Sequence, residues 1–259
     1  MKRPRISARP FRSIFRILAL FQDFIAQDFR DLNGIQANII RMGGLVEEAI
    51  LEAARSLDER DVERAQTVRA GDKVVDALEE AINDQCARLI ALRAPTAVDL
   101  RIVLSVMKVG GNLERIGDYA KNMAKRTSLL VDMPAVPGAH ASLRRMSREV
   151  QLLLKDAIDA FIQRDADLAR DVIRRDHDID QMYNALFREF LTFMMEDPRN
   201  ITPCMHLHFI AKNTERMGDH VTAIAEQVVY LVTGERPDEN RPKGDTTSTN
   251  VAAGVDKKG

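Results

Sequence analysis

The sequence contains an internal repeat of about 100 residues, and this repeat limits the folds that the chain can adopt. Residues 112–118 (NLERIGD) recur as residues 213–219 (NTERMGD), 101 positions later, with five of the seven residues identical. Upstream, a second set of positions recurs 104 residues later: Asp61, Ala65, Asp72 and Asp76 return as Asp165, Ala169, Asp176 and Asp180. Self-similarity at a fixed period indicates one structural unit present twice.

The residue pattern within each repeat predicts helices. The aromatic share is 5% and tryptophan is absent, and from about residue 26 apolar residues recur at helical spacing. We expect helices over about residues 28–57, 62–92 and 96–130, the third beginning at a Thr96-x-x-Asp99 capping pattern. Three more helices follow a segment with two prolines and a glycine. The fold class is therefore all-α, with six helices in two tandem homologous three-helix bundles, packed side by side or end to end.

These features divide the chain into five parts. The first is a basic, amphipathic N-terminal stretch, which either rests on a membrane surface or partner or results from an upstream start codon, and to which we assign no function. The last is polar, rich in proline and glycine, and predicted to be disordered. The predicted boundaries are 1–25 for the extension, 26–131 for the first repeat, 132–141 for the linker, 142–234 for the second repeat and 235–259 for the tail.

Charge and hydropathy exclude two classes of partner. Lysine and arginine number 38 against 39 acidic residues, so the net charge of -1 provides no overall positive field for nucleic acid. No apolar run reaches the roughly 18 residues of a membrane span, so the chain is not expected to be integral to a membrane. Cys86 and Cys204 lie far apart without a CxxC motif, which favours buried free thiols in a reducing compartment.

Acidic residues four positions apart are the most distinctive chemical feature. Such a spacing places two carboxylates on one helix face, where they repel each other by a few tenths of a kcal/mol, roughly, unless a cation neutralises them. If neighbouring helices bring two pairs together, the oxygen-rich site suits magnesium, manganese, calcium or iron. The alternative is an exposed face with salt bridges to adjacent arginines. The candidate metal ligands are Asp72, Asp76, Glu114 and Asp118 in the first repeat, and Asp176, Asp180, Glu215 and Asp219 in the second.

The two repeats differ around these acids. Lys121 and Lys125 share the face of the first-repeat pair, whereas Thr222 and Glu226 take those places in the second repeat. The second repeat is therefore the better candidate for a metal site. A glycine also lies inside each motif, at positions 117 and 218, at a cost of about 1 kcal/mol to the helix, which predicts close approach by a neighbouring helix.

No catalytic residues are predicted. Carboxylate-rich di-iron bundles need Glu-x-x-His pairs, and none of the five histidines has an acidic residue three positions earlier. The sequence also lacks GxxxxGK[ST] and HExxH motifs. His206 and His208 are two positions apart and do not share a helix face, so we interpret the histidines as structural.

The chain resembles the PhoU family of phosphate-signalling regulators over about residues 24–234. The resemblance rests on MGGLVEEAI (42–50), ALRAPTAVDLR (91–101), NLERIGDYAKNMAKR (112–126) and NTERMGDHVTAIAE (213–226), with Thr214 where the family usually has leucine. It implies two homologous three-helix bundles, a cytoplasmic location and dimerisation. It also implies metal clusters on the eight carboxylates named above, holding a hard divalent or trivalent ion such as Fe, Mg, Mn, Zn or Ca.

The resemblance also implies a function and partners. Proteins of this kind act beside a phosphate ABC transporter and a phosphate-sensing histidine kinase, without catalytic activity. They limit uptake through the transporter's ATPase subunit and keep starvation genes off when phosphate is plentiful. The competing interpretation is a structural dimerisation or scaffold module with no metal or phosphate role.

Overall fold

The computed structural model describes residues 11–95 and 97–236, and this part of the chain is built from six long α-helices without a strand. The predicted all-α class and the predicted helix number are thus confirmed. A short 3-10 turn, η1 (Pro198–Asn200), precedes the last helix. The helices are α1 (Phe11–Glu59), α2 (Val62–Arg93), α3 (Ala97–Leu130), α4 (Ala139–Gln163), α5 (Ala166–Glu196) and α6 (Ile201–Thr233).

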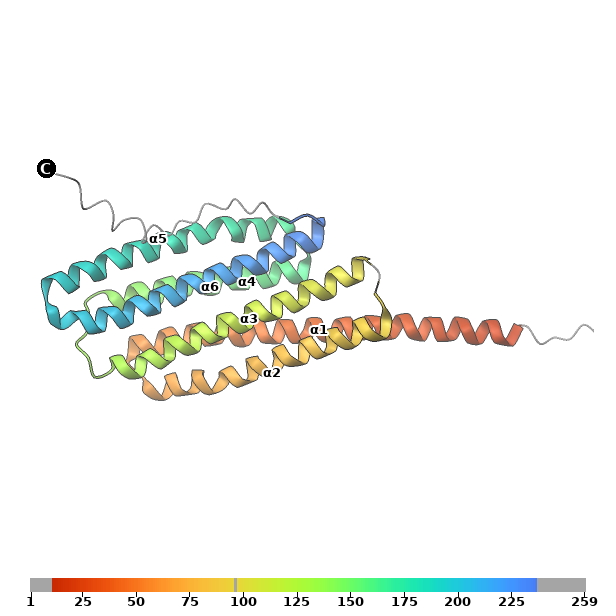
Figure 1. Ribbon diagram of the computed structural model, residues 1–259, viewed down its shortest axis with the longest axis horizontal. Coiled ribbons are helices and arrows are strands. Elements are labelled where there is room, and N and C mark those ends of the chain that lie inside the picture. The colour runs from red at the N-terminus through yellow and green to blue at the C-terminus, as the bar shows by residue number, and fades with distance from the viewer. Residues whose placement is uncertain (1–10, 96, 237–259) are drawn as a thin grey trace, which may run out of the picture.

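The two three-helix units lie side by side, which settles the arrangement that the sequence left open (Figure 1). Helix α1 packs against α4 and α3 packs against α6, so these four helices form the seam between the units. Helix α2 packs on α1 and α3, and α5 packs on α4 and α6, at the two outer sides. The predicted pair of three-helix bundles is confirmed.

Most helix boundaries match the prediction, but the start of the first helix does not. Helix α1 begins at Phe11 rather than near residue 28, and its N-terminal part extends beyond the bundle (Figure 1). Residues 11–25 of the predicted extension are therefore part of the same continuous helix as the first repeat. Helix α4 begins at Ala139, inside the predicted 132–141 linker. Thr96 of the predicted cap and residues 237–259 of the predicted tail lie outside the described residues.

In each unit, the second helix begins with an aspartate that serves as its N-cap. Asp61 caps α2 by accepting a hydrogen bond from the backbone N–H of Arg64 at 2.9 Å. Asp165 caps α5 in the same way, accepting from the N–H groups of residues 167 and 168. The preceding residues, Arg60 and Arg164, both adopt the left-handed conformation, with φ of 55° and 54°. The first recurring aspartate of the repeat is therefore an N-cap, which fixes where the following acids lie.

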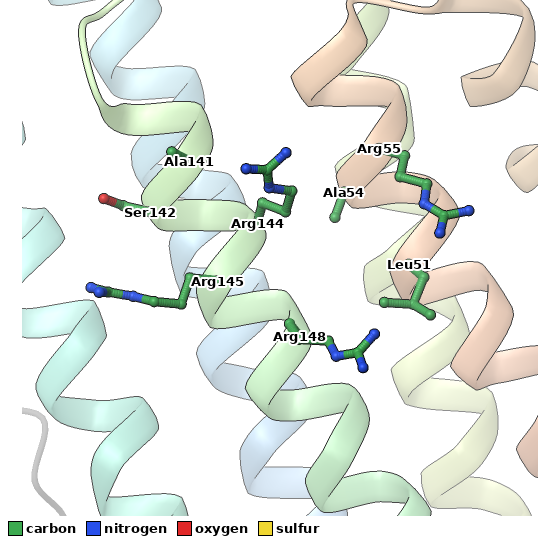
Figure 2. Close-up of a pocket in the computed structure, with 8 residues that line it drawn as sticks. All are labelled: Leu51, Ala54, Arg55, Ala141, Ser142, Arg144, Arg145 and Arg148. Atoms are coloured by element: carbon green, nitrogen blue, oxygen red, sulfur yellow. The ribbon is translucent and has the colours of Figure 1, made fainter.

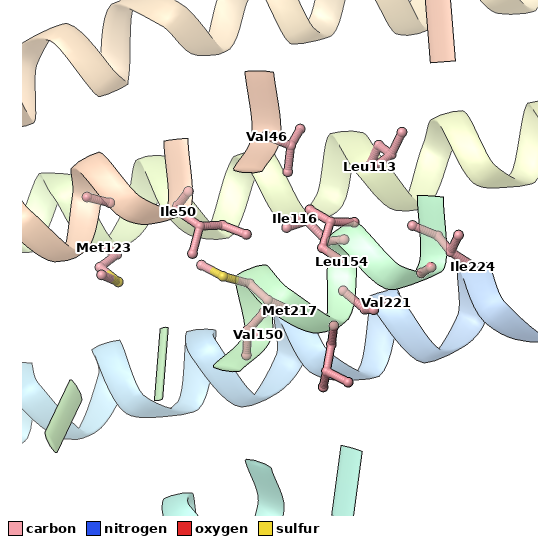
Figure 3. Close-up of a cluster of buried hydrophobic side chains, with 14 of the residues drawn as sticks. Val46, Ile50, Leu113, Ile116, Met123, Val150, Leu154, Met217, Val221 and Ile224 are labelled. Atoms are coloured by element: carbon pink, nitrogen blue, oxygen red, sulfur yellow. The ribbon is translucent and has the colours of Figure 1, made fainter. Parts of the chain in front are cut away.

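A single hydrophobic core runs across the seam. Val46 and Ile50 of α1, Ile116 of α3, Val150 of α4 and Met217 of α6 are all completely buried where the four inner helices meet (Figure 3). Both cysteines are free and buried, as predicted. Because the seam is as apolar as the interior of each bundle, the two units should unfold together.

Candidate functional site

The acidic pairs of the first repeat meet where α2 crosses α3. Lys121 on α3 lies 2.5 Å from Asp72 Oδ2 on α2 and 2.8 Å from Asp118 Oδ1 on its own helix. Asp72 is only 7% exposed, so this ammonium group supplies the charge that stabilises a nearly buried carboxylate. Lys121, which the sequence placed on the face of Glu114 and Asp118, thus also reaches Asp72 on the neighbouring helix and joins two of the predicted metal ligands.

The other two acids of the first repeat belong to the same cluster. The pKa of Glu114 is raised, first by burial and then by the neighbouring charge of Asp118. The pKa of Asp76 is raised by burial and by the charge of Asp72, while Lys121 acts in the opposite direction. These mutual effects place all four carboxylates of the first repeat in one region, with Lys121 as its cation.

The acids of the second repeat, the second cluster, lie on α5 and α6, which pack against each other as α2 and α3 do. Asp176, Asp180 and Glu215 are 2%, 5% and 5% exposed, so this cluster is more deeply buried than the first. Lys212 lies 2.8 Å from Glu215 Oε1 and its ammonium lies 4.9 Å from the centre of the Tyr183 ring. The clustering of these acids around a metal ion stays a prediction, and the structure adds Lys212, which the sequence did not single out although it lies three residues before Glu215.

Glycine allows these close helix contacts, as predicted. A methyl group added to Gly218 would lie 2.6 Å from Asp176 Oδ1, far inside normal contact distance. At the equivalent Gly117, the added carbon would lie 3.4 Å from Val75 Cγ1 and 3.8 Å from Asp72 Oδ1. In both repeats the glycine therefore faces the aspartate of the neighbouring helix, and the approach is tighter in the second.

The position of Lys121 is occupied in the second repeat by Thr222. Thr222 is 1% exposed, and its hydroxyl group forms no hydrogen bond within the part of the chain that the structure describes. Carboxylates with a hydroxyl are a suitable donor set for a hard cation. In the first repeat a lysine takes the place of this hydroxyl and contacts two of the acids, whereas the second-repeat Lys212 lies at another position, where it contacts Glu215. The donor chemistry of the second cluster therefore fits a metal ion better than that of the first.

Neither cluster has the arrangement of a finished metal centre. Among the side chains that the structure describes, no three histidine, cysteine, aspartate or glutamate residues are positioned to hold one ion together. The eight predicted ligands therefore do not form a coordination sphere in this structure. Metal binding at either group would require side-chain rotation.

Two histidines of α6, His206 and His220, lie at the seam between the units. Nδ1 of His220 lies 2.8 Å from Asn112 Oδ1 on α3, and the rings of His220 and Tyr119 are 5.7 Å apart. Nδ1 of His206 lies 3.1 Å from a guanidinium nitrogen of Arg126. These contacts give both side chains a role in joining α6 to α3.

In the described residues, no helix is both long enough and apolar enough to cross a membrane.

Comparison with known proteins identifies the family. The PhoU domain matches twice, at residues 39–127 and 143–228. A "phosphate-specific transport system accessory protein PhoU homolog" of Caulobacter vibrioides is 44% identical over 218 residues, which cover 84% of this chain and 95% of that protein. A protein of the same name from Rhizobium meliloti is 42% identical over 220 residues, or 85% and 92% of the two chains.

Two crystal structures have the same fold. PhoU from Pseudomonas aeruginosa superposes with a TM-score of 0.77 at 38% identity, covering 80% of this chain and 99% of the other. The phosphate transport system regulatory protein PhoU from Streptococcus pneumoniae gives 0.75 at 30% identity, covering 82% and 99%. The repeated motif, the paired three-helix bundles and these matches together show that the chain belongs to the PhoU family.

Proposed function

We propose that this protein restrains phosphate uptake and keeps phosphate-starvation genes off when phosphate is plentiful. The observation that supports this proposal is the match along nearly the full length of relatives named as accessory proteins of the phosphate-specific transport system. The protein acts by contact, in the cytoplasm, with the ATPase subunit of a phosphate ABC transporter and with a phosphate-sensing histidine kinase. It acts as a homodimer and has no catalytic activity of its own.

A metal ion contributes to this function at the second carboxylate cluster. Asp176, Asp180, Glu215 and Asp219 would hold a hard divalent or trivalent ion, which would neutralise their charges and link α5 to α6. The buried Thr222 hydroxyl and the absence of a lysine at that position support this assignment. The first cluster, whose lysine already contacts two acids, binds metal less readily.

A reporter assay tests the regulatory function. Alkaline phosphatase activity is measured in phosphate-rich medium after deletion of the gene and after its return on a plasmid. High activity in the deletion strain, lowered again by the plasmid, is the expected result. Unchanged low activity would exclude repression of starvation genes and leave phosphate uptake, measured with labelled phosphate, as the remaining output.

The carboxylates separate this proposal from a scaffold without a metal role. The double variant Asp176→Asn/Asp219→Asn should lose bound metal in elemental analysis and lose repression in the reporter assay. The matched control Asp84→Asn/Asp178→Asn removes two exposed acids and should behave as the parent protein. Full repression by the cluster variant would favour the scaffold, in which the helix surfaces act alone.

A further inference from the structure

A cleft rich in arginine lies at the seam between the two units, on the side where α1 packs against α4 (Figure 2). Its volume is about 590 Å³, and it is distinct from both carboxylate clusters. Residues of both repeats line it: Leu51, Ala54, Arg55, Ala141, Ser142, Arg144, Arg145 and Arg148.

The charge of this cleft is entirely positive among its described lining residues, which include four arginines and no acid. Arg144 and Arg148 extend from α4 on the side that faces α1, one on each side of the level of Leu51, while Arg55 and Arg145 point outward from the two margins (Figure 2). Arg144 and Arg148 are four residues apart on one helix face, so their guanidinium groups repel each other and a bound anion would stabilise the arrangement.

Only part of this charge is neutralised by the protein. Arg55 pairs with Glu52 at 2.7 Å and Arg144 pairs with Asp58 at 2.5 Å, both on α1. Arg145 and Arg148 form no ion pair with any described residue. All four side chains are exposed, and the two existing pairs are at the protein surface, where such pairs contribute little stability and are readily exchanged.

The start of α4 adds to the positive potential. The first ten residues of this helix contain one histidine and three arginines but no acid. Its N-cap, Gly138, offers no side chain to the first turn, and the first turn has no acidic residue. The N-terminal end of a helix carries a partial positive charge, and Ala141 and Ser142 of the cleft lie in the first turn of α4, close to that end.

The chemistry of the lining indicates the class of ligand. All four basic side chains are arginine, whose planar fork binds phosphate oxygens in pairs, whereas lysine acts as a point charge. The volume lies within the range of about 300–1,000 Å³ typical of small-molecule sites and exceeds what a single phosphate would fill. A hollow between two helices suits a compact ligand better than a flat membrane surface.

We propose that this cleft binds a small anion that carries two or more linked phosphate groups. The phosphates lie between the guanidinium groups of Arg144 and Arg148, and the exposed side chains of Arg55 and Arg145, which point outward in the structure, turn toward the anion when it binds. Because α1 and α4 belong to different repeats, the bound anion ties the two units together across the seam. The site is separate from the proposed metal cluster, so loss of either leaves the other intact.

Titration calorimetry on the full chain tests the proposal, with inorganic tripolyphosphate as the probe. We expect saturable binding that weakens as salt increases, and orthophosphate binding at least about tenfold more weakly because it engages fewer guanidinium groups. Equal affinity for ATP would assign recognition to the triphosphate in either molecule, and binding of tripolyphosphate alone would assign it to the inorganic chain. No saturable binding of either probe, or orthophosphate binding as tightly, would overturn the proposal.

Variants locate the binding to this cleft. Arg144→Gln/Arg148→Gln should weaken tripolyphosphate binding by at least about tenfold, since two charged contacts are lost. Arg144→Lys/Arg148→Lys keeps the charge and should retain part of the affinity. The control Arg69→Gln/Arg88→Gln removes the same charge from exposed positions of α2. Equal loss in the control would show general charge attraction and refute a defined site, and melting curves establish that every variant is folded.

Discussion

Replacing Gly218 by alanine should destabilise the protein relative to the same change at Gly117. In a helix, alanine is favoured over glycine by about 1 kcal/mol, and this gain is common to both positions. At Gly218, however, the new carbon would lie 2.6 Å from Asp176 Oδ1, so that the carboxylate has to move. Asp176 is 2% exposed and has partners in the fold, and overpacking of this kind costs about 1–3 kcal/mol. At Gly117 the nearest atom, Val75 Cγ1, stays at 3.4 Å and needs no adjustment.

Thermal unfolding of the two variants, followed by circular dichroism, measures this difference. At about 2–4 °C per kcal/mol for a chain of this size, Gly218→Ala should melt roughly 2–12 °C below Gly117→Ala. Gly111, which has no neighbour within 4 Å, provides the baseline for the helix gain alone. In an Asp176→Ala background the added carbon meets no carboxylate, so Gly218→Ala should then stabilise as Gly117→Ala does. A melting temperature of Gly218→Ala at or above that of Gly117→Ala would refute the close contact.

Three further outcomes follow from the core and from the titrating groups. Ile116→Ala should cost about 2–5 kcal/mol and keep a single calorimetric transition, because this fully buried side chain lies in the core shared by both units; two separate transitions would contradict a shared core. Burial raises the pKa of the Cys86 thiol to about 11 and also raises that of Cys204, so neither should react with a thiol reagent at pH 8 until the protein unfolds. Burial, followed by the charge of Arg60, lowers the pKa of His140 below its usual 6.5. The folded state therefore binds this proton less tightly than the unfolded chain does, and the free energy of unfolding falls as the pH drops from about 6.5 toward the lower pKa of the folded state. His140→Gln should flatten this part of the curve of stability against pH. An unchanged curve would show that His140 does not have a lowered pKa in the folded protein.

Helices were the most predictable part of this protein, because their signals are local. The 62–92 and 96–130 helices were placed almost to the residue from apolar spacing and from the proline and glycine breaks between them. The first helix was misplaced because no break separates residues 11–27 from the following pattern, and a compositional change was taken for a boundary. Capping residues, proline and glycine mark the end of a helix, and where they are missing the neighbouring sequence does not predict the boundary.

The sequence indicated the acids of the candidate site but not the side chains that neutralise them. Recurrence singled out the eight carboxylates, and the glycine inside each motif pointed to a close helix contact, which is observed in both repeats. The spacing did not reveal that Lys121 bridges Asp72 and Asp118, since one of those acids lies on another helix. Whether an acid faces a lysine or a buried hydroxyl depends on how neighbouring helices are rotated, which a single helix does not determine.

The sequence by itself therefore determined the helices, their duplication and the carboxylates that each copy carries, because these follow from periodicity and from residues within one helix. The tertiary structure alone decided that the two units lie side by side over one core. It also decided that Arg55 of the first repeat and Arg148 of the second line a single cleft. Both results depend on side-chain packing between helices distant in the chain, where contact energies are set by three-dimensional fit rather than by sequence spacing.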